Sequence, residues 1–171
     1  MPDYAAIYKT VFANAGYCVH PEDEFRYAYC RDFISTHPIQ SIADIGSGRG
    51  TLIASILSYR PDIQICSVDI NKFHHQQVPH INLDLSSTDG IALLCALRVD
   101  LVTCTDVLEH LLESHVAEAI EAIANAAPYA VVTIANHSDI LDGVELHLTQ
   151  QPSQWWRSLL ERHFTILDDR S

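Results

Sequence analysis

Two hydrophobic patterns alternate along most of the chain. From residue 41 onward, short apolar runs are followed by segments in which apolar residues recur every three or four positions. The runs predict buried strands and the spaced segments predict amphipathic helices, an alternation typical of a parallel α/β sheet. We expect strands at Ser41 to Ile45, Gln64 to Asp69, His80 to Leu83, Asp100 to Cys104, Tyr129 to Ala135 and Phe164 to Leu167.

Helical spacing adds elements before, between and after these strands. Two helices are expected ahead of the first strand, over residues 3–15 and from residue 20 to residue 38. Asn71 to Pro79 is too short and polar to predict a regular helix, and residues 136–151 are predicted to be a polar loop. The remaining expected helices are Thr51 to Tyr59, Thr88 to Leu97, Glu113 to Ala126 and a last one that starts at Pro152.

Three glycines directly follow the first predicted strand. Gly46, Gly48 and Gly50 stand at alternate positions, and Thr51 begins a predicted helix. Glycine reaches positive φ at no steric cost, and the free N–H groups of a helix start point toward the same place, so the turn favours a nucleotide-like ligand. Thr51 stands where the dinucleotide-binding pattern G-x-G-x-x-G has its last glycine, which disfavours a nicotinamide or flavin cofactor.

Composition and charge restrict the partners. With 171 residues, 48% of them hydrophobic and 19% charged, the chain is expected to form one structural domain. The formal net charge of -12 repels the phosphates of nucleic acid and of an anionic membrane at long range. It favours a small, neutral or cationic substrate, unless a local basic patch or a partner subunit overrides it.

Cysteine usage and the first residues predict the compartment. The five cysteines are odd in number and lack C-x-x-C spacing, which disfavours a disulfide framework and a cysteine zinc site. No apolar run approaches the roughly 20 residues of a membrane helix. The start, Met-Pro-Asp-Tyr-Ala, lacks a basic region followed by an apolar stretch, so no signal peptide is predicted. A cytoplasmic location is the resulting expectation.

Acidic residues accompany the predicted strand ends. Asp69 ends the second strand, about 20 residues past the glycine turn, where a carboxylate can accept hydrogen bonds from ribose hydroxyls. The stretch Asp44-Ile-Gly-Ser-Gly-Arg-Gly50 resembles motif I of the class I S-adenosylmethionine-dependent methyltransferases, acid-x-Gly-x-Gly-x-Gly. Asp106-Val-Leu-Glu-His-Leu111 resembles the D-x-L-E-H-L stretch that many of these enzymes carry after strand four when they act on small molecules. The resemblance spans residues 41 to about 136 and continues more weakly to 167.

This resemblance implies a fold, a cofactor and a set of binding residues. The fold is a Rossmann-like, doubly wound, mostly parallel sheet with helices on both faces, and the cofactor is S-adenosylmethionine, with S-adenosylhomocysteine as product. Asp84 is implied to contact the adenine amino group, with Leu83 or Leu85 against the ring. The expected cofactor-binding residues are Asp44, Gly46, Ser47, Gly48, Gly50, Asp69, Ile70, Asp84, Leu85, Thr105, Asp106 and Val107.

Methyl transfer to oxygen or nitrogen also requires removal of a proton from the acceptor. His110, His137 and His147 follow the fourth and fifth predicted strands, and histidine titrates near neutral pH, so these three are the candidate bases. A structural, hydrogen-bonded histidine is the alternative for each. The segment around His147, with Pro152 and Trp155 after it, resembles one that follows strand five in some methyltransferases of this type.

No metal site is predicted. His74, His75 and His80 are close in sequence, but they lack a defined ligand spacing such as that of H-E-x-x-H. A solvated histidine-rich loop is the preferred interpretation of this segment.

The sequence therefore predicts a methyltransferase that uses S-adenosylmethionine to methylate an oxygen or nitrogen of a small molecule. Residues 41–171 form the cofactor-binding part, and residues 1–40 supply helices that cover the cofactor cleft. The alternative hypothesis is a non-catalytic or degenerate partner subunit that binds the cofactor, against which the intact glycine turn, Asp69 and Asp84 argue. Methylation of protein or nucleic acid is disfavoured by the acidic charge.

The predicted sheet is trimmed at its C-terminal edge. Class I enzymes normally end in an antiparallel pair after strand five, whereas one final strand is apparent here, with Glu145 to Leu148 as a substitute for the missing one. A second copy of the chain or a partner subunit is therefore a candidate to complete the edge.

Overall fold

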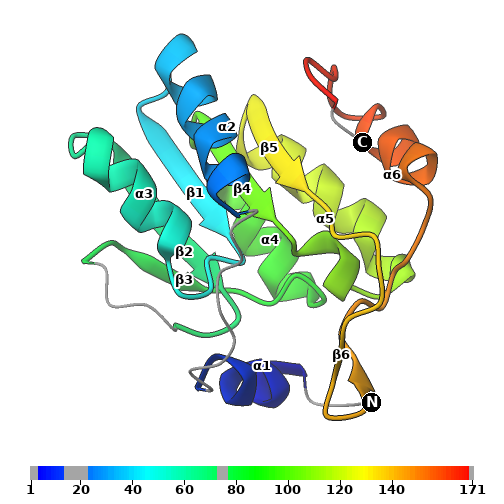
Figure 1. Cartoon of the computed structure of the whole chain (residues 1–171). Coiled ribbons are helices and arrows are strands. Elements are labelled where there is room, and N and C mark those ends of the chain that lie inside the picture. The colour runs from blue at the N-terminus through cyan, green and yellow to red at the C-terminus, as the bar shows by residue number, and fades with distance from the viewer. Residues whose placement is uncertain (1–3, 14–22, 73–76, 170–171) are drawn as a thin grey trace.

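A parallel sheet forms the centre of the molecule (Figure 1). The structure is a computed structural model, and it describes residues 4–13, 23–72 and 77–169. The strand order is β3-β2-β1-β4-β5, and every neighbouring pair is parallel, which confirms the predicted Rossmann-like α/β fold. The strands are β1 (Ser41–Ile45), β2 (Gln64–Asp69), β3 (His80–Asn82), β4 (Leu101–Thr105) and β5 (Tyr129–Thr133).

Helices cover both faces of this sheet (Figure 1). α2 and α3 pack on one face through Ile34 and Ile53, whereas α4 and α5 pack on the other through Leu94 and Ile120. Because both faces are covered, the central strands β1 and β4 are apolar and buried almost throughout. The helices are α1 (Tyr4–Ala13), α2 (Asp23–Thr36), α3 (Thr51–Tyr59), α4 (Thr88–Ala96), α5 (Glu113–Ala126) and α6 (Ser153–Leu160), with a short 3₁₀ turn η1 (Leu108–His110).

Two elements lie at the carboxyl ends of the strands. α1 crosses this end of the molecule beside a small hairpin, which is built from β6 (Ile140–Leu141) and β7 (Val144–Glu145) (Figure 1). The hairpin turn consists of Asp142 and Gly143, with φ of 50° and 79°. An Asp-Gly pair with two positive φ values is what a tight two-residue hairpin requires. Both elements therefore border the end of the sheet at which ligands bind in open α/β folds.

The C-terminal part differs from the prediction. The strand expected at Phe164 to Leu167 is wrong, because this segment is irregular and pairs with none of the strands in the described residues. Phe164 packs against the core, but the side chain of Leu167 is 66% exposed. The expected substitute strand around Glu145 belongs to the hairpin, which forms a sheet of its own. Within the described residues, β5 is therefore the edge of the main sheet, and its completion by a partner stays a prediction.

Other boundaries agree to within a few residues. Residues 3, 14–15, 20–22 and 73–76 of the expected segments lie outside the described residues, and with them His74 and His75. None of the described helices combines the length and the apolar character that a membrane span requires. The division of the chain at residue 40 stays a prediction, as does coverage of the cofactor cleft by both N-terminal helices.

Candidate functional site

The glycine turn joins β1 to α3 at the carboxyl end of the sheet. Gly46, Gly48 and Gly50 have φ of 67°, 48° and 69°, in the left-handed region that costs other residues about 1–2 kcal/mol. Gly46 is restricted further, because a Cβ at this position would lie 2.2 Å from Cγ2 of Val107. The turn after β1 and the loop after β4 are thus in direct contact.

Asp69, at the end of β2, holds the glycine turn in place. Its Oδ2 accepts a hydrogen bond from the Gly48 amide at 2.8 Å, and its Oδ1 accepts one from the Asn71 amide at 3.1 Å. The Gly46 amide donates to the Val68 carbonyl at 2.8 Å. The predicted ribose-binding carboxylate and the glycine turn are therefore brought together, and Ile70 follows them at the surface of the same loop.

Asp44 lies in β1 beneath the turn and is 2% exposed. Its Oδ1 accepts a hydrogen bond of 2.7 Å from the Thr103 hydroxyl on the neighbouring strand. Burial raises the pKa of the Asp44 carboxyl to about 7, the Thr103 hydrogen bond opposes this rise, and the charge of Asp69 adds to it. Because ionisation of this carboxyl is costly, a positively charged ligand nearby would stabilise its ionised form.

Ser47 supplies an independent indication of a ligand. Its hydroxyl oxygen is buried, and it finds no hydrogen-bond partner within the part of the chain that the structure describes. Buried polar groups normally are hydrogen-bonded, so an orphaned hydroxyl in the glycine turn fits a polar group of a bound molecule. The residues present thus fit a cofactor such as S-adenosylmethionine.

Asp84 and Leu85 follow β3 at the same end of the sheet. The Asp84 carboxylate accepts hydrogen bonds from the amide and the hydroxyl of Ser86, at 2.8 and 2.7 Å. Leu85 is 7% exposed, and a Cβ at Gly90 would lie 2.0 Å from the Asp84 carbonyl oxygen, so this loop is tightly packed on the start of α4. Their contact with an adenine ring stays a prediction.

The loop after β4 contains Thr105, Asp106 and Val107. Asp106 adopts a φ of 54°, which is unusual for a residue with a side chain. The Thr133 hydroxyl donates to its carboxylate at 3.0 Å, and the Asp106 amide donates to the Thr133 carbonyl at 3.0 Å. These two bonds to β5 fix the left-handed residue and direct the chain into η1.

A buried acid and two histidines come together directly after this loop. Glu109 and His110 belong to η1, His147 follows β7, and one ligand-type atom of each lies within 4.8 Å of those of the others. Glu109 is fully buried and its Oε1 accepts a hydrogen bond of 2.6 Å from the Ala135 amide, while His147 is 4% exposed. We call Glu109, His110 and His147 the Glu-His-His cluster. One carboxylate and two imidazoles form a donor set that suits a divalent transition metal.

The three predicted catalytic histidines are neighbours. The rings of His110 and His147 have centroids 4.7 Å apart, and those of His137 and His147 are 5.1 Å apart. Nδ1 of His147 lies 2.5 Å from the His137 carbonyl, and His137 itself is exposed. Sequence reasoning thus selected residues that the structure brings together, although a catalytic role for each stays a prediction.

His110 is held as a neutral ring. Burial lowers the pKa of its imidazole to about 4, and the neighbouring His147 lowers it further, while the carbonyls of Leu146 and Asp106 and the carboxylate of Asp139 act in the opposite direction. A neutral imidazole has a lone pair that can bind a metal ion or take up a proton.

Sequence reasoning missed two residues of this region. Glu109 stood inside the D-x-L-E-H-L stretch, next to a selected histidine, and that adjacency was the available signal. Tyr8 of α1 contacts His110, which is 102 positions away, and no sequence pattern indicates such a contact. In the histidine-rich segment, for which no metal site is predicted, Nδ1 of His80 lies 2.7 Å from the Ser67 hydroxyl, and His74 and His75 lie outside the described residues.

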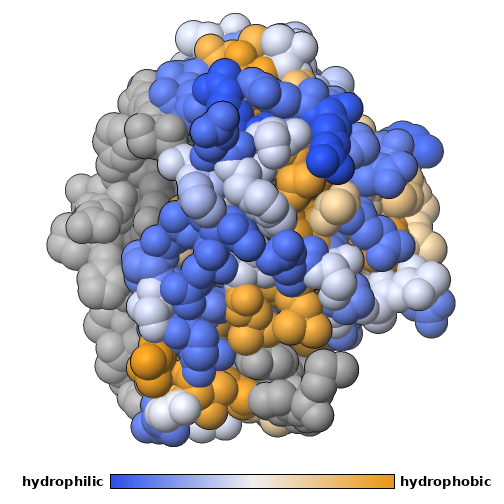
Figure 2. Space-filling model, turned by 90° about the vertical axis from the view of Figure 1, so that its right-hand side faces the viewer, coloured by the Kyte–Doolittle hydropathy of each residue, from blue (hydrophilic) through white to orange (hydrophobic). Residues whose placement is uncertain are grey.

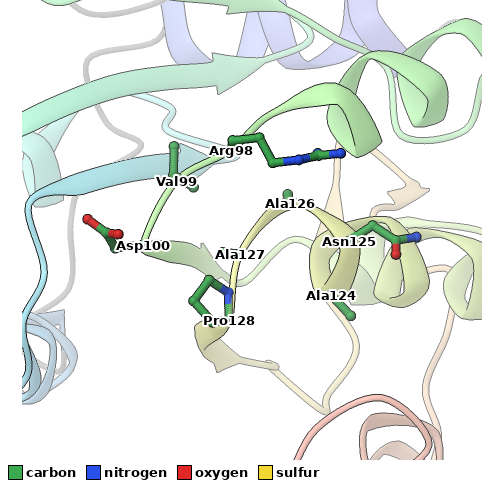
Figure 3. A pocket seen from close by; sticks show the side chains of 8 residues that line it. All are labelled: Arg98, Val99, Asp100, Ala124, Asn125, Ala126, Ala127 and Pro128. Carbon is green, nitrogen blue, oxygen red and sulfur yellow. The ribbon is translucent and has the colours of Figure 1, made fainter.

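The surface near this end of the sheet is mixed. Figure 2 shows the face that carries α6 and the hairpin, with apolar side chains gathered mainly in its lower half. Ile140 of the hairpin is 65% exposed and Leu112, after η1, is 40% exposed. By contrast, the hollow in Figure 3 is lined by residues 98–100 and 124–128, at the opposite end of the strands, and it contains none of the predicted site residues.

The sheet order, the glycine turn after β1 and the acid after β2 define the fold of class I methyltransferases. The chain belongs to the methyltransferase domain family, which it matches over residues 12–171. The predicted family is thereby confirmed, and S-adenosylmethionine is its cofactor.

Individual relatives differ in what they methylate. A small RNA 2'-O-methyltransferase of Rattus norvegicus is 29% identical over 154 residues, which cover 77% of this chain and 39% of that protein. The chain thus spans less than half the length of this curated relative. A SAM-dependent methyltransferase from Archaeoglobus fulgidus has a similar structure, with a TM-score of 0.62 and 20% identity over 94% of this chain and 73% of that one. The N-methyltransferase NodS from Bradyrhizobium japonicum, in complex with S-adenosyl-L-homocysteine, also has a similar structure. Its TM-score is 0.57, with 15% identity over 74% of this chain and 68% of that one.

Proposed function

We propose that this methyltransferase domain transfers a methyl group to a hydroxyl oxygen with the assistance of a divalent cation, and that the hydroxyl is a ribose 2'-hydroxyl of RNA. The observation that carries the proposal is the Glu-His-His cluster, which is buried beside the loop after β4. A hydroxyl is a weak nucleophile until its proton is lost, and both a cation and a neutral imidazole promote that loss.

The cofactor is assigned to the glycine turn and the strand ends around it. Asp69 would hold the ribose hydroxyls, Asp84 and Leu85 the adenine, and Ser47, with its orphaned hydroxyl, a polar group at the other end of the molecule. Asp44 beneath the turn favours a positive charge above it. When bound, S-adenosylmethionine supplies a methyl group activated on a sulfonium. The protein has to align this methyl group with the acceptor and to exclude water.

The Glu-His-His cluster is assigned to the acceptor side. Glu109 would contribute one carboxylate oxygen, and His110 and His147 one imidazole nitrogen each, to a divalent cation that lowers the pKa of the acceptor hydroxyl. Nδ1 of His147 faces the His137 carbonyl, which leaves its Nε2 as the ligand nitrogen. If no cation binds, an imidazole of the cluster serves as the general base.

Two observations support an RNA acceptor in spite of the acidic net charge. The curated relative named above acts on small RNA. In addition, Lys9 of α1, Arg49 of the glycine turn and Lys72 after β2 all belong to segments at the carboxyl end of the sheet. Positive side chains near the site are what phosphate groups require, whereas the overall charge of -12 acts against long-range attraction. That charge favours the alternative acceptor, a small molecule methylated at oxygen or nitrogen.

Transfer of labelled methyl groups tests this proposal. The purified protein is incubated with radiolabelled S-adenosylmethionine and either a single-stranded RNA or DNA of the same sequence, with Mn²⁺ or with a chelator. We expect label on the RNA only, strongly reduced by the chelator. Glu109→Gln should reduce transfer by about 10²-fold or more, whereas the control Glu113→Gln, at an exposed glutamate, should retain it.

Three outcomes would contradict parts of the proposal. Label on small alcohols or amines but not on RNA supports the small-molecule alternative. Equal transfer with Mn²⁺ and with chelator removes the cation and leaves the histidines as bases. Cofactor binding by calorimetry without transfer to any acceptor supports the hypothesis of a non-catalytic subunit.

A further inference from the structure

Helix α1 reaches the Glu-His-His cluster through one side chain. The hydroxyl of Tyr8 lies 2.5 Å from Nδ1 of His110, and the two rings meet edge to face, with centroids 5.5 Å apart and an interplanar angle of 89°. Figure 1 shows α1 beside the hairpin at the carboxyl ends of the strands. Tyr8 therefore links an N-terminal element to a ring that the proposed function uses.

The same nitrogen has a second neighbour. Nδ1 of His110 also lies 3.0 Å from the carbonyl oxygen of Leu146, directly before His147. A neutral imidazole carries one N–H, and a carbonyl only accepts hydrogen bonds, whereas a tyrosine hydroxyl both donates and accepts. If Nδ1 carries the proton, it can donate to Leu146 and to the Tyr8 oxygen together. If Nε2 carries it, a lone pair of Nδ1 faces the Leu146 oxygen, which is unfavourable.

The Leu146 carbonyl, which can only accept, therefore selects the tautomer of His110 that carries its proton on Nδ1, and the Tyr8 oxygen accepts from the same N–H group. With the proton on Nδ1, the lone pair is on Nε2, which is then the nitrogen that can bind a cation or take up a proton. The tyrosine oxygen and the Leu146 carbonyl also fix the ring orientation, because they hold it from two different elements. Loss of the tyrosine hydroxyl would leave one acceptor and a ring with more freedom.

We propose that Tyr8 is a positioning residue, which fixes the orientation of the His110 imidazole by accepting a hydrogen bond from its Nδ1–H group, and which so makes the cluster dependent on α1 lying across the strand ends. The inference rests on the proposed function of the cluster, since it assigns Tyr8 a role in that same site. It adds a requirement that the acceptor side of the site is complete only when the N-terminal helix is in place.

Nitrogen-15 NMR of the histidine side chains tests this without cofactor or acceptor. We expect the parent protein to show His110 with its proton on Nδ1 and with that proton shifted downfield by two acceptors, and Tyr8→Phe, which retains the ring packing, to keep this tautomer and move the proton signal upfield. Tyr129→Phe is the matched control, because Tyr129 meets the His37 ring edge-on at 5.4 Å in another part of the molecule. It should leave the His110 signals unchanged.

Two functional readouts complete the experiment. Tyr8→Phe should weaken Mn²⁺ binding by about tenfold, as is typical when a hydrogen-bond partner of a metal ligand is removed. It should lower kcat for methyl transfer while the Kd for S-adenosylmethionine stays the same. An Nε2–H tautomer in the parent, or a parental Nδ1–H signal and Mn²⁺ affinity in Tyr8→Phe, would overturn the inference. If the parent transfers no methyl group but the Nδ1–H signal moves as expected, the proposed function fails and the positioning role stands.

Discussion

Gly46 and Val107 lie in two loops that can approach each other only because glycine has no side chain. Gly46 follows β1 and Val107 follows β4, and a Cβ on the glycine would penetrate the valine methyl group at 2.2 Å. The glycine also has a φ of 67°, so two separate physical effects restrict this position. The contact holds the turn after β1 against the loop after β4.

Gly46→Ala should therefore destabilise the fold by about 2–5 kcal/mol, the combined cost of left-handed strain and of overpacking. Gly143→Ala is the matched control, since Gly143 has a φ of 79° with open space around its Cβ position. It should cost only about 1–2 kcal/mol. Urea unfolding followed by circular dichroism measures both.

The double variant Gly46→Ala with Val107→Ala separates the two effects. Removal of the valine methyl groups should recover the steric part and leave the conformational part, which gives a coupling of about 1–3 kcal/mol between the two sites. Strict additivity of the two single changes would show that the methyl contact contributes nothing.

Sequence reasoning at this scale found residues whose type is unusual for their local pattern. Three alternating glycines after one apolar strand and an acid at the end of the next are easily recognised in the sequence. In a parallel sheet the carboxyl ends of neighbouring strands lie together, so these residues are expected to be close in space. The Tyr8 hydroxyl and the buried carboxylate of Glu109 could not be found in this way. Their partners, His110 and the Ala135 amide, are brought near only by the completed fold.

At the scale of elements, the hairpin of β6 and β7 illustrates a structure held by one half-buried side chain. Glu145 accepts hydrogen bonds from the amides of Asp139 and His147, at 2.9 and 3.0 Å, and from the Ser138 hydroxyl. The Ser138 hydroxyl and then the Asp139 amide are the main causes that lower the pKa of the Glu145 carboxyl to about 2. His147 follows this hairpin, so the hairpin positions His147 in the cluster.

Glu145→Ala should loosen this hairpin without unfolding the sheet. Amide hydrogen exchange at Asp139 and His147 should accelerate several-fold, because these amides lose their acceptor, while amides of α5 keep their rates. Glu161→Ala, which removes an exposed glutamate from the end of α6, is the control. Unchanged exchange at both hairpin amides would indicate that the turn residues alone hold the hairpin.

Elements were predictable where packing is regular. The first five strands and the helices between them follow from continuous apolar runs and helical spacing, because each is buried against neighbours on known faces. The strand at Phe164 to Leu167 failed for the opposite reason. A four-residue run forms a strand only if it pairs with a neighbour, and although β5 is an edge strand this segment does not pair with it and leaves Leu167 66% exposed. The two-residue strands of the hairpin were too short to give a pattern.

Asp44 and His110, two of the largely buried ionisable groups in the described residues, act oppositely on the stability of the whole molecule. Asp44 has a folded-state pKa raised from 3.8 to about 7, so its contribution to stability is lost as pH rises through that range. His110 has a pKa lowered from 6.5 to about 4, so its contribution is lost as pH falls through that range. Each group changes the free energy of unfolding by up to about 1.4 kcal/mol per pH unit, and between pH 4 and 6.5 the two changes oppose each other.

Single substitutions should separate the pH dependence of stability that each of the two groups causes. In cofactor-free protein with a chelator present, the stability of Asp44→Asn relative to the parent should rise from pH 4 to 7, and that of His110→Gln should rise in the opposite direction, toward low pH. Chemical unfolding at several pH values measures these differences. Parallel profiles for the parent and both variants would contradict the assigned pKa values.

The parts of the acceptor side come from distant stretches of the chain, and this has a consequence for synthesis. A ribosome releases Tyr8 first, then the glycine turn with the strands that surround it, and His147 only after β5 and most of the hairpin. A nascent chain thus contains all residues of its cofactor turn while the Glu-His-His cluster still lacks a member. During translation, the residues that hold the methyl donor are therefore synthesised before the set of residues that acts on the acceptor is complete.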